Sequence, residues 1–505
     1  MSPKRLLPLV VILIVLGVLA VLFKRSSAPP QLAQEVGLER LVPPTLHADS
    51  ITGFELYRGA QPQEVVRLHK RDGTWVVTSR FDTPGNSTKI AQFLTQLSTL
   101  QGELRADSTA LLGDFQLTDE QALHLKVYTD TPDKPALYLL AGKGSGGNGF
   151  VRRAGEGRVY YVNVHVQSLA GLTSGTPEQT LSAKPWLDLR VQNVPKEQVA
   201  AVELLSPTHE LRFTTQPAAA AGSTDASPTS AAPPAPVWKL MAPELAYNVK
   251  SDAVEGLVTT LRNLQGDDVV DPAKAAEYGL DAPPYRAILT VQPSGQEARQ
   301  AAVLIGNEVP EKSGSRYARL GETGPVYIVP QWSVQRLFPT LGTLLDLRIL
   351  QVPQEEVIRL TLHADGESWS LERQDPAAAT AGETPATTAT WHFVGLADVP
   401  VDETAVTSLL GATAQLNADD LPTSPPAQTG LDQPRWQVFL TQRDGRTERL
   451  VLGQAVGQDS SGYYASRGDA AEIFIVSGMI QKTLTDAVAK LKPSPAATAK
   501  VPARP

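Results

Sequence analysis

The chain has 505 residues, a formal net charge of −8 and no cysteine. This length accommodates about three domains of ordinary size. The lack of cysteine excludes disulfides, thiolate metal sites and cysteine nucleophiles. The charge is spread along the chain without a basic block, so we expect no nucleic acid as a partner.

An apolar run near the start predicts a membrane anchor. It extends from Leu6 to Phe23, with basic residues on both sides, and is just long enough to span a bilayer core. A cleaved signal peptide is the alternative, but Lys24 and Arg25 stand where small residues precede a cleavage site. We expect 1–25 to form a cytoplasmic start and single-pass anchor, and 26–48 a tether. The rest of the chain should then lie on the periplasmic side of the inner membrane.

A strand led by tryptophan and followed by an amphipathic helix occurs three times, beginning at Trp75, Trp238 and Trp391. Apolar residues follow each strand at offsets 0, 3, 4, 7 and 10, which is the spacing of one helix face. The three faces are Ile90, Phe93, Leu94, Leu97, Leu100; Val254, Leu257, Val258, Leu261, Leu264; and Val406, Leu409, Leu410, Thr413, Leu416. The pattern predicts three modules of one fold. Each helix should start at a capping residue: Ser87, Asp252 with Glu255 three residues later as a capping box, and Asp402. The bounds of the modules are 49–190, 191–350 and 351–492, with a disordered tail at 493–505.

Two stretches rich in proline, alanine, serine and threonine interrupt this pattern at 217–236 and 375–390. We interpret them as hairpin-loop inserts within the second and third modules, because lengthening a loop costs little free energy. A second recurrence, Leu-Asp-Leu-Arg, begins at Leu187 and at Leu345. It predicts a structural junction between successive modules, with a functional Asp–Arg ion pair as the alternative.

No motif predicts catalytic, cofactor-binding or metal-ligating residues. The glycine-rich segment 142–149 lacks the residue order of a phosphate-binding loop, and similar segments beginning at Gly306 and Gly453 indicate a hairpin loop instead. The seven histidines show no metal-ligand spacing, and no GxSxG elbow occurs. Acidic pairs such as Asp419-Asp420 are interpreted as solvated turn residues. We therefore expect a protein that is not an enzyme and has no cofactor.

Aromatic and basic residues do recur before the last strand of each module. They are Phe150 and Arg153, Tyr317 and Arg319, and Tyr464 and Arg467. A ligand groove combines such aromatic and guanidinium groups. Ordinary edge-strand residues with a satisfied arginine are the alternative interpretation.

Structural residues also carry a family resemblance, most fully in the second module. They are Trp238, Pro243, Tyr278-Gly279-Leu280-Asp281, Pro283, Leu304-Ile305-Gly306, Tyr317 and Val326-Tyr327. The third module keeps Gly430-Leu431-Asp432 and Pro434, whereas the first has Gln116-Leu117-Thr118 in place of the GLD sequence. This pattern resembles the bacterial family called domain of unknown function 4340. The resemblance implies a membrane-anchored envelope protein, often encoded beside ABC-type transporters such as gliding-motility systems, and it brings no catalytic residues.

We expect an α+β protein in which an N-terminal transmembrane helix precedes three tandem modules, each an antiparallel sheet packed on its amphipathic helix. The expected function is a non-enzymatic envelope scaffold, accessory to an ABC-type transport system and in contact with its subunits. A binding module for an envelope polymer or lipid is the alternative, and an enzyme is the least favoured.

Overall fold

The computed structural model describes residues 37–129, 134–173, 179–216, 237–375, 389–396, 399–422, 428–457 and 461–493. These residues form two compact units. One unit runs to Leu189 and includes Asp268–Pro272, and the other begins at Arg190. The transmembrane segment predicted at 6–23 lies outside the described residues.

The first unit contains one ten-stranded sheet with antiparallel pairing. Its spatial order is β1 (Glu39–Arg40), β6 (Gln101–Asp107), β10 (Arg158–Val162), β9 (Asn148–Arg153), β8 (Leu137–Ser145), β7 (Leu123–Tyr128), β2 (Gly53–Arg58), β3 (Gln61–Arg71), β4 (Thr74–Val77) and β5 (Thr83–Pro84). Its α-helices are α2 (Ser87–Ser98) and α3 (Val166–Leu169).

The second unit contains two further antiparallel sheets, except that Asp268–Val270, an edge strand of the eight-stranded sheet, belongs to the first unit. The eight-stranded sheet has the order β13 (Val237–Ala242), β12 (Glu210–Gln216), β11 (Val199–Leu205), β15 (Tyr285–Val291), β16 (Arg299–Val309), β17 (Lys312–Leu320), β18 (Val326–Val329) and β14 (Asp268–Val270). The seven-stranded sheet has the order β21 (Thr390–Phe393), β20 (Glu367–Gln374), β19 (Val357–Ala364), β22 (Trp436–Gln442), β23 (Thr447–Val456), β24 (Gly462–Arg467) and β25 (Phe474–Ser477). The α-helices are α4 (Ser251–Arg262), α5 (Gln331–Leu337), α6 (Leu341–Leu344), α7 (Glu403–Thr413) and α8 (Gly478–Leu491).

One strand order recurs in all three sheets. The run β4-β3-β2-β7-β8-β9-β10 in the first sheet corresponds to β13-β12-β11-β15-β16-β17-β18 and to β21-β20-β19-β22-β23-β24-β25. In chain order, each run starts with a three-strand meander whose third strand is the tryptophan strand. It ends with a four-strand meander. The repeat predicted from the tryptophan strands is therefore a repeat of topology.

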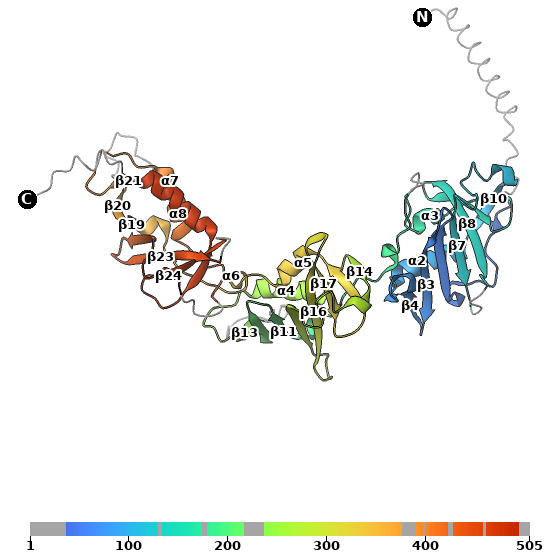
Figure 1. Ribbon diagram of the computed structural model, residues 1–505, viewed down its shortest axis with the longest axis horizontal. Coiled ribbons are helices and arrows are strands. Elements are labelled where there is room, and N and C mark those ends of the chain that lie inside the picture. Colours follow the sequence, from blue (N-terminus) through green and yellow to red (C-terminus); the bar gives the residue numbers. More distant parts are fainter. Residues whose placement is uncertain are drawn as a thin grey trace, which may run out of the picture. The chain divides into compact units, whose positions relative to one another are not determined.

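The three predicted helix faces are buried, which confirms the helical periodicity. All five predicted positions of each face are at most 5% exposed. Thr413 belongs to this set, and its hydroxyl donates to the Leu409 carbonyl at 2.7 Å, so the one polar member is satisfied within α7. On the sheet side, the ring of Phe54 in β2 lies 5.1 Å from that of Phe93 in α2. In the second unit α4 contacts α5, and α7 contacts α8 (Figure 1).

The helix starts agree with the sequence only in part. Asp402 caps α7 as predicted, because its side chain accepts from the Ala405 N–H at 3.0 Å. Helix α2 is capped by Asn86, one residue before the predicted Ser87. The capping box predicted at Asp252 and Glu255 is wrong, since α4 begins after Lys250 without a side-chain cap. Glu255 instead accepts from the indole N–H of Trp238 at 3.2 Å.

The predicted fold class is wrong. The described residues form three antiparallel sheets with few helices, rather than an α+β protein behind a transmembrane helix. None of the helices in the described ranges is long and apolar enough to cross a bilayer. The sequence pattern led us to expect a helical layer against each sheet. In the structure a single twelve-residue helix such as α4 accompanies a sheet of eight strands. Short strands such as β1, β5 and β14 had no periodic signal.

The strands that flank both inserts pair with each other. Gln216 lies opposite Val237, and Gln374 lies opposite Thr390. Residues 217–236 and 376–388 are outside the described residues, as is the predicted tail from 494 onward.

Candidate functional site

The candidate site lies where the second and third modules join, within the second unit. The segment from Leu345 to Arg348 is hydrogen-bonded on both sides. Leu345 forms an isolated bridge with Val249, just before α4, and Arg348 forms one with Asn417, just after α7. Leu345 is fully buried, so apolar packing supports the backbone pairing. The side chain of Arg348 forms an ion pair with Asp346.

The equivalent segment at Leu187 makes the equivalent bonds. Leu187 forms a bridge with Gly85, before α2, within the first unit. Arg190 forms a bridge with Gln265, after α4, within the second unit. The recurring Leu-Asp-Leu-Arg sequence is therefore structural in both places. Its first residue pairs beside the helix start of the preceding module and its last residue beside the helix end of the following module.

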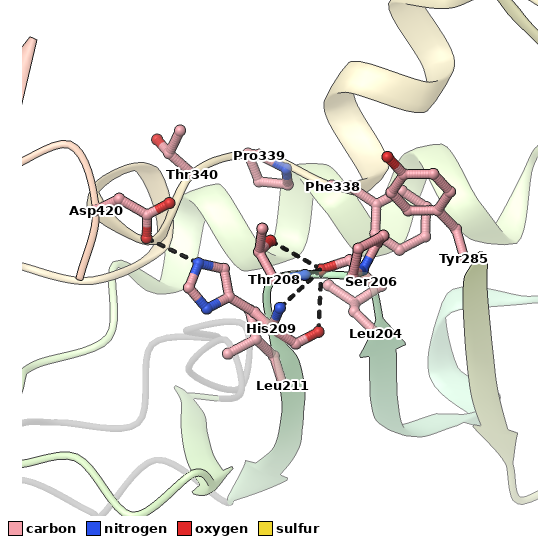
Figure 2. Close-up of a pocket in the computed structure, with 11 residues that line it drawn as sticks. Leu204, Ser206, Thr208, His209, Leu211, Tyr285, Phe338, Pro339, Thr340 and Asp420 are labelled. Atoms are coloured by element: carbon pink, nitrogen blue, oxygen red, sulfur yellow. Dashed lines mark hydrogen bonds and ion pairs between the residues drawn. The ribbon is translucent and has the colours of Figure 1, made fainter. Parts of the chain in front are cut away.

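A pocket of about 190 Å³ opens next to this joint (Figure 2). It is lined by Leu204, Ser206, Pro207, Thr208, His209, Leu211, Tyr285, Phe338, Pro339, Thr340 and Asp420. The turn between β11 and β12 supplies its polar wall, the chain after α5 supplies Phe338 to Thr340, and the third module supplies Asp420. The rings of Tyr285 and Phe338 are 4.9 Å apart and form an apolar end.

An ion pair crosses the joint at the edge of this pocket. Nε2 of His209 lies 2.9 Å from Oδ1 of Asp420, and the two side chains are 14% and 23% exposed. Figure 2 shows the imidazole directed toward the carboxylate. The distance is short, but Nε2 does not meet hydrogen-bond geometry, so we treat the contact as an electrostatic one. It attracts most strongly when the imidazole is protonated.

The hydroxyl groups of the pocket hold the turn together. The Ser206 hydroxyl accepts from the His209 N–H at 2.9 Å and donates to the His209 carbonyl at 3.0 Å. Ser206 therefore bonds to the backbone of His209, whereas a nucleophile would bond to the imidazole. The geometry fixes the turn, and the turn presents the imidazole to the neighbouring module. This arrangement couples two modules.

Sequence reasoning missed this site. Asp419-Asp420 was interpreted as a pair of solvated turn residues, but the Asp419 carbonyl accepts from the Gly342 N–H at 2.8 Å and Asp420 pairs with His209. No sequence signal could have linked His209 to Asp420, because the two residues lie in different modules and share no motif.

The residues predicted to form a ligand groove occupy three separate sheets. The three aromatic residues hold equivalent register positions. Phe150 immediately precedes the residue that pairs with Ala141, Tyr317 the residue that pairs with Ile305, and Tyr464 the residue that pairs with Leu452. The arginines are not equivalent. Arg153 pairs with Leu139 and Arg467 with Leu450, whereas Arg319 pairs with Leu304, which is the register position of Arg152. A shift of one residue places a side chain on the opposite face of a strand.

The contacts of these arginines also differ. Arg153 forms an ion pair with Glu39 at 2.9 Å, and Arg467 forms one with Glu448 at 2.6 Å. Arg319 is 8% exposed. Tyr317 stacks on Tyr278 at 4.2 Å, and Phe150 lies 4.7 Å from Phe115. The structure thus brings aromatic rings together within modules, and it does not align the three arginines.

A hydrogen-bonded cluster that the sequence did not reveal lies on the first sheet. Nε2 of His124 is 2.6 Å from the Asp119 carbonyl, which only accepts, so Nε2 carries the proton in the neutral ring. Nδ1 then accepts from the Tyr138 hydroxyl at 2.7 Å, and Tyr138 accepts from Tyr57 at 2.9 Å. Burial lowers the pKa of His124 and, with the Tyr57 hydroxyl, raises the pKa of Tyr138 to about 12.

Among the described residues, no group of three or more histidine, aspartate or glutamate side chains is placed to hold a metal ion. The cluster around His124 supplies one imidazole and two phenols, a set that divalent metals do not favour.

A family model described as "Domain of unknown function (DUF4340)" matches residues 75–236, 238–389 and 391–492. The chain belongs to this family. The three matches begin at Trp75, Trp238 and Trp391, the tryptophans that lead the repeated strands. No curated protein and no solved structure matches the chain.

The family unit is shifted relative to the sheets. The first match runs through β11 and β12 and stops before β13, although these three strands are neighbours in one sheet. The first two DUF4340 matches therefore end inside a hairpin, and the third ends just after α8. The first sheet adds strands that precede the first match, and each of the other two sheets combines strands of two successive matches. Tandem copies of the family unit complete one another's sheets.

Proposed function

We propose that the chain is a non-enzymatic interaction scaffold of the cell envelope, located outside the cytoplasm and accessory to an ABC-type transport system. The observation that supports this role most is the shared junction, in which Leu345 and Arg348 pair with successive modules. Backbone pairing on both sides couples the two modules and keeps two sheets in one compact unit. Such a unit presents several surfaces to partners at once.

Two exposed sheet edges provide surfaces for such partners. Strands β13 and β21 each end their sheet. Val237 and Met241 on β13 are 49% and 50% exposed, and Val394, just after β21, is 48% exposed. An edge strand with exposed apolar side chains offers backbone groups and contact area to a strand of another protein. The repetition of the edge in two modules favours an extended or multivalent partner.

The test is crosslinking in envelope preparations, followed by affinity purification of the tagged full chain and identification of the captured proteins. We expect subunits of an ABC-type transporter to be enriched over an untagged control. Replacing Met241 and Val394 with lysine should remove this enrichment, because charge on an edge blocks strand addition. The matched variant Lys239→Arg, also on β13, should retain it.

Melting curves should show that all variants remain folded. Equal recovery of transporter subunits with the edge variants would contradict the edge as the contact surface. Recovery of no transporter subunit with the native chain would contradict the proposed function.

A further inference from the structure

The first unit contains a second pocket, which no part of the scaffold role uses. Its volume is about 390 Å³, within the range of small-molecule sites. It is lined by Thr52, Gly53, Glu55, Arg67, Leu68, His69, Thr78, Tyr128 and Thr129. We propose that this pocket binds an uncharged sugar unit of an envelope glycan. This binding goes beyond the scaffold role and rests only on the envelope location proposed above.

The pocket lies on the face of the sheet opposite to α2. Phe54 and Leu56 of β2 are fully buried, and Phe54 contacts α2, so Gly53 and Glu55 point to the other face. Gly53 lies between His69 on β3 and Tyr128 on β7. Because glycine has no side chain, the sheet surface is open at Gly53, between the ring of His69 on one side and the ring of Tyr128 on the other.

Neighbouring atoms approach Gly53 closely. A Cβ atom at Gly53 would lie 3.0 Å from Nδ1 of His69 and 3.1 Å from the Leu68 carbonyl. The other modules fill the equivalent position. Ala201 stands there in the second sheet and Arg359 in the third, and Arg359 pairs across strands with Glu372. The pocket is therefore specific to the first module.

The charged groups at the end of the pocket are paired and firmly held. Glu55, whose side chain is 17% exposed, accepts from Nε of Arg67 at 2.5 Å and from the Tyr128 hydroxyl at 3.1 Å. Burial, followed by the charge of Glu55, raises the pKa of Tyr128 to about 12, so the hydroxyl stays protonated. The Thr52 and Thr78 hydroxyls donate to backbone carbonyls at 2.7 and 3.2 Å, which fixes the rim.

This charge arrangement selects the class of ligand. An anion attracted by Arg67 would be repelled by Glu55, and a cation attracted by Glu55 would be repelled by Arg67. A neutral ligand that carries neighbouring hydroxyl groups can donate to the carboxylate and accept from the guanidinium at the same time. The rings of His69 and Tyr128 offer apolar faces to the C–H groups of a sugar ring. A pyranose satisfies all of these requirements.

The test is binding of the full chain to an array of neutral, uronic-acid and sulfated oligosaccharides, with affinities of the bound members measured by calorimetry. We expect binding of neutral members and a marked preference over the acidic ones. Glu55→Gln and Tyr128→Phe should each weaken binding about tenfold or more, because hydrogen bonds to a charged group are lost or changed. The control variant Glu372→Gln, which breaks the Arg359–Glu372 ion pair of the third module, should bind like the native chain.

Vesicles that display a neutral glycolipid distinguish the two sources of such a sugar. Binding to free oligosaccharides indicates a polymer, and binding to the vesicles alone indicates a lipid headgroup; both support a neutral-sugar site. Two results would overturn the proposal: no neutral glycan bound in either form, or binding unchanged in both pocket variants while their melting temperatures match that of the native chain.

Discussion

Single residues determine the turns that position the strands of each module. Gly279 in the Gly-Leu-Asp sequence has φ +73°, and a Cβ atom there would lie 2.6 Å from Oδ1 of Asn307. Gly430, its counterpart in the third module, has φ +68°. The left-handed conformation and the close approach together explain why this position carries glycine in both modules.

We predict that Gly279→Ala lowers the free energy of unfolding by about 1 to 2 kcal/mol, the usual cost of a Cβ in the left-handed region. Gly256 is the matched control, because it lies on α4 with nothing within 4 Å of its added Cβ. Gly256→Ala should raise stability by about 0.5 to 1 kcal/mol through helix propensity. Urea denaturation measures both. A stability change of the same sign in the two variants would contradict the conformational argument.

His124 makes the stability of the first unit depend on pH. Its folded pKa is lowered, first by burial, so the unfolded chain takes up a proton at higher pH than the folded chain. The contribution of neutral His124 is complete above the unfolded value of about 6.5 and is lost as pH falls below it. Denaturation of the native chain should show a stability loss between pH 7 and 5, with a shallower slope for His124→Gln. The same slope in both proteins would remove His124 as the cause.

At the scale of elements, the tryptophan strands of the second and third modules are tied to the start of the following helix. The backbone N–H of Trp238 donates to the Ser251 hydroxyl at 3.3 Å, and that of Trp391 donates to Glu403 at 2.7 Å. Trp238 is 3% exposed and lies against the face of α4. Strand and helix therefore form one packing unit, as the sequence predicted.

We predict that Trp238→Ala costs about 3 to 5 kcal/mol, the usual range for emptying a large aromatic site. Because modules two and three form one compact unit, the loss should appear in the unfolding of both modules. Trp332→Ala is the control, since that side chain is 56% exposed and its removal should change stability by about 0.5 kcal/mol or less. Chemical denaturation with limited proteolysis measures the effect. An unchanged midpoint for Trp238→Ala would show that this ring does not stabilise the core.

At the scale of the whole molecule, the joint between the second and third modules unites backbone pairing with a side-chain pair. The His209–Asp420 contact is partly shielded from solvent, which strengthens it relative to a fully exposed pair. Its removal should loosen the joint without unfolding either sheet, because neither side chain belongs to a sheet core.

A double-mutant cycle tests this coupling. His209→Ala, Asp420→Ala and the double variant should show a coupling energy of about 1 kcal/mol, because the two side chains are in contact. Denaturation of the second unit within the full chain provides the measurement. Strictly additive effects of the two substitutions would mean that the pair does not join the modules.

The sequence by itself determined the local features of this protein. Apolar positions at helical spacing fixed the faces of α2, α4 and α7, and the recurring tryptophans and Gly-Leu-Asp turns revealed the repeat and the family. These signals are readable because they depend on residues close together in the chain, where periodicity translates directly into a buried face.

Only the tertiary structure decided which distant residues meet. The strand register places Arg319 at the position equivalent to Arg152 rather than Arg153. The joint brings Asp420 to His209. Gly53 lines a pocket because His69 and Tyr128 lie opposite it on the two neighbouring strands. The sheets also gained short edge strands that lack periodicity, which made the protein richer in strands than predicted. Cross-strand neighbours are set by pairing register, and register is a property of two segments that neither segment encodes alone.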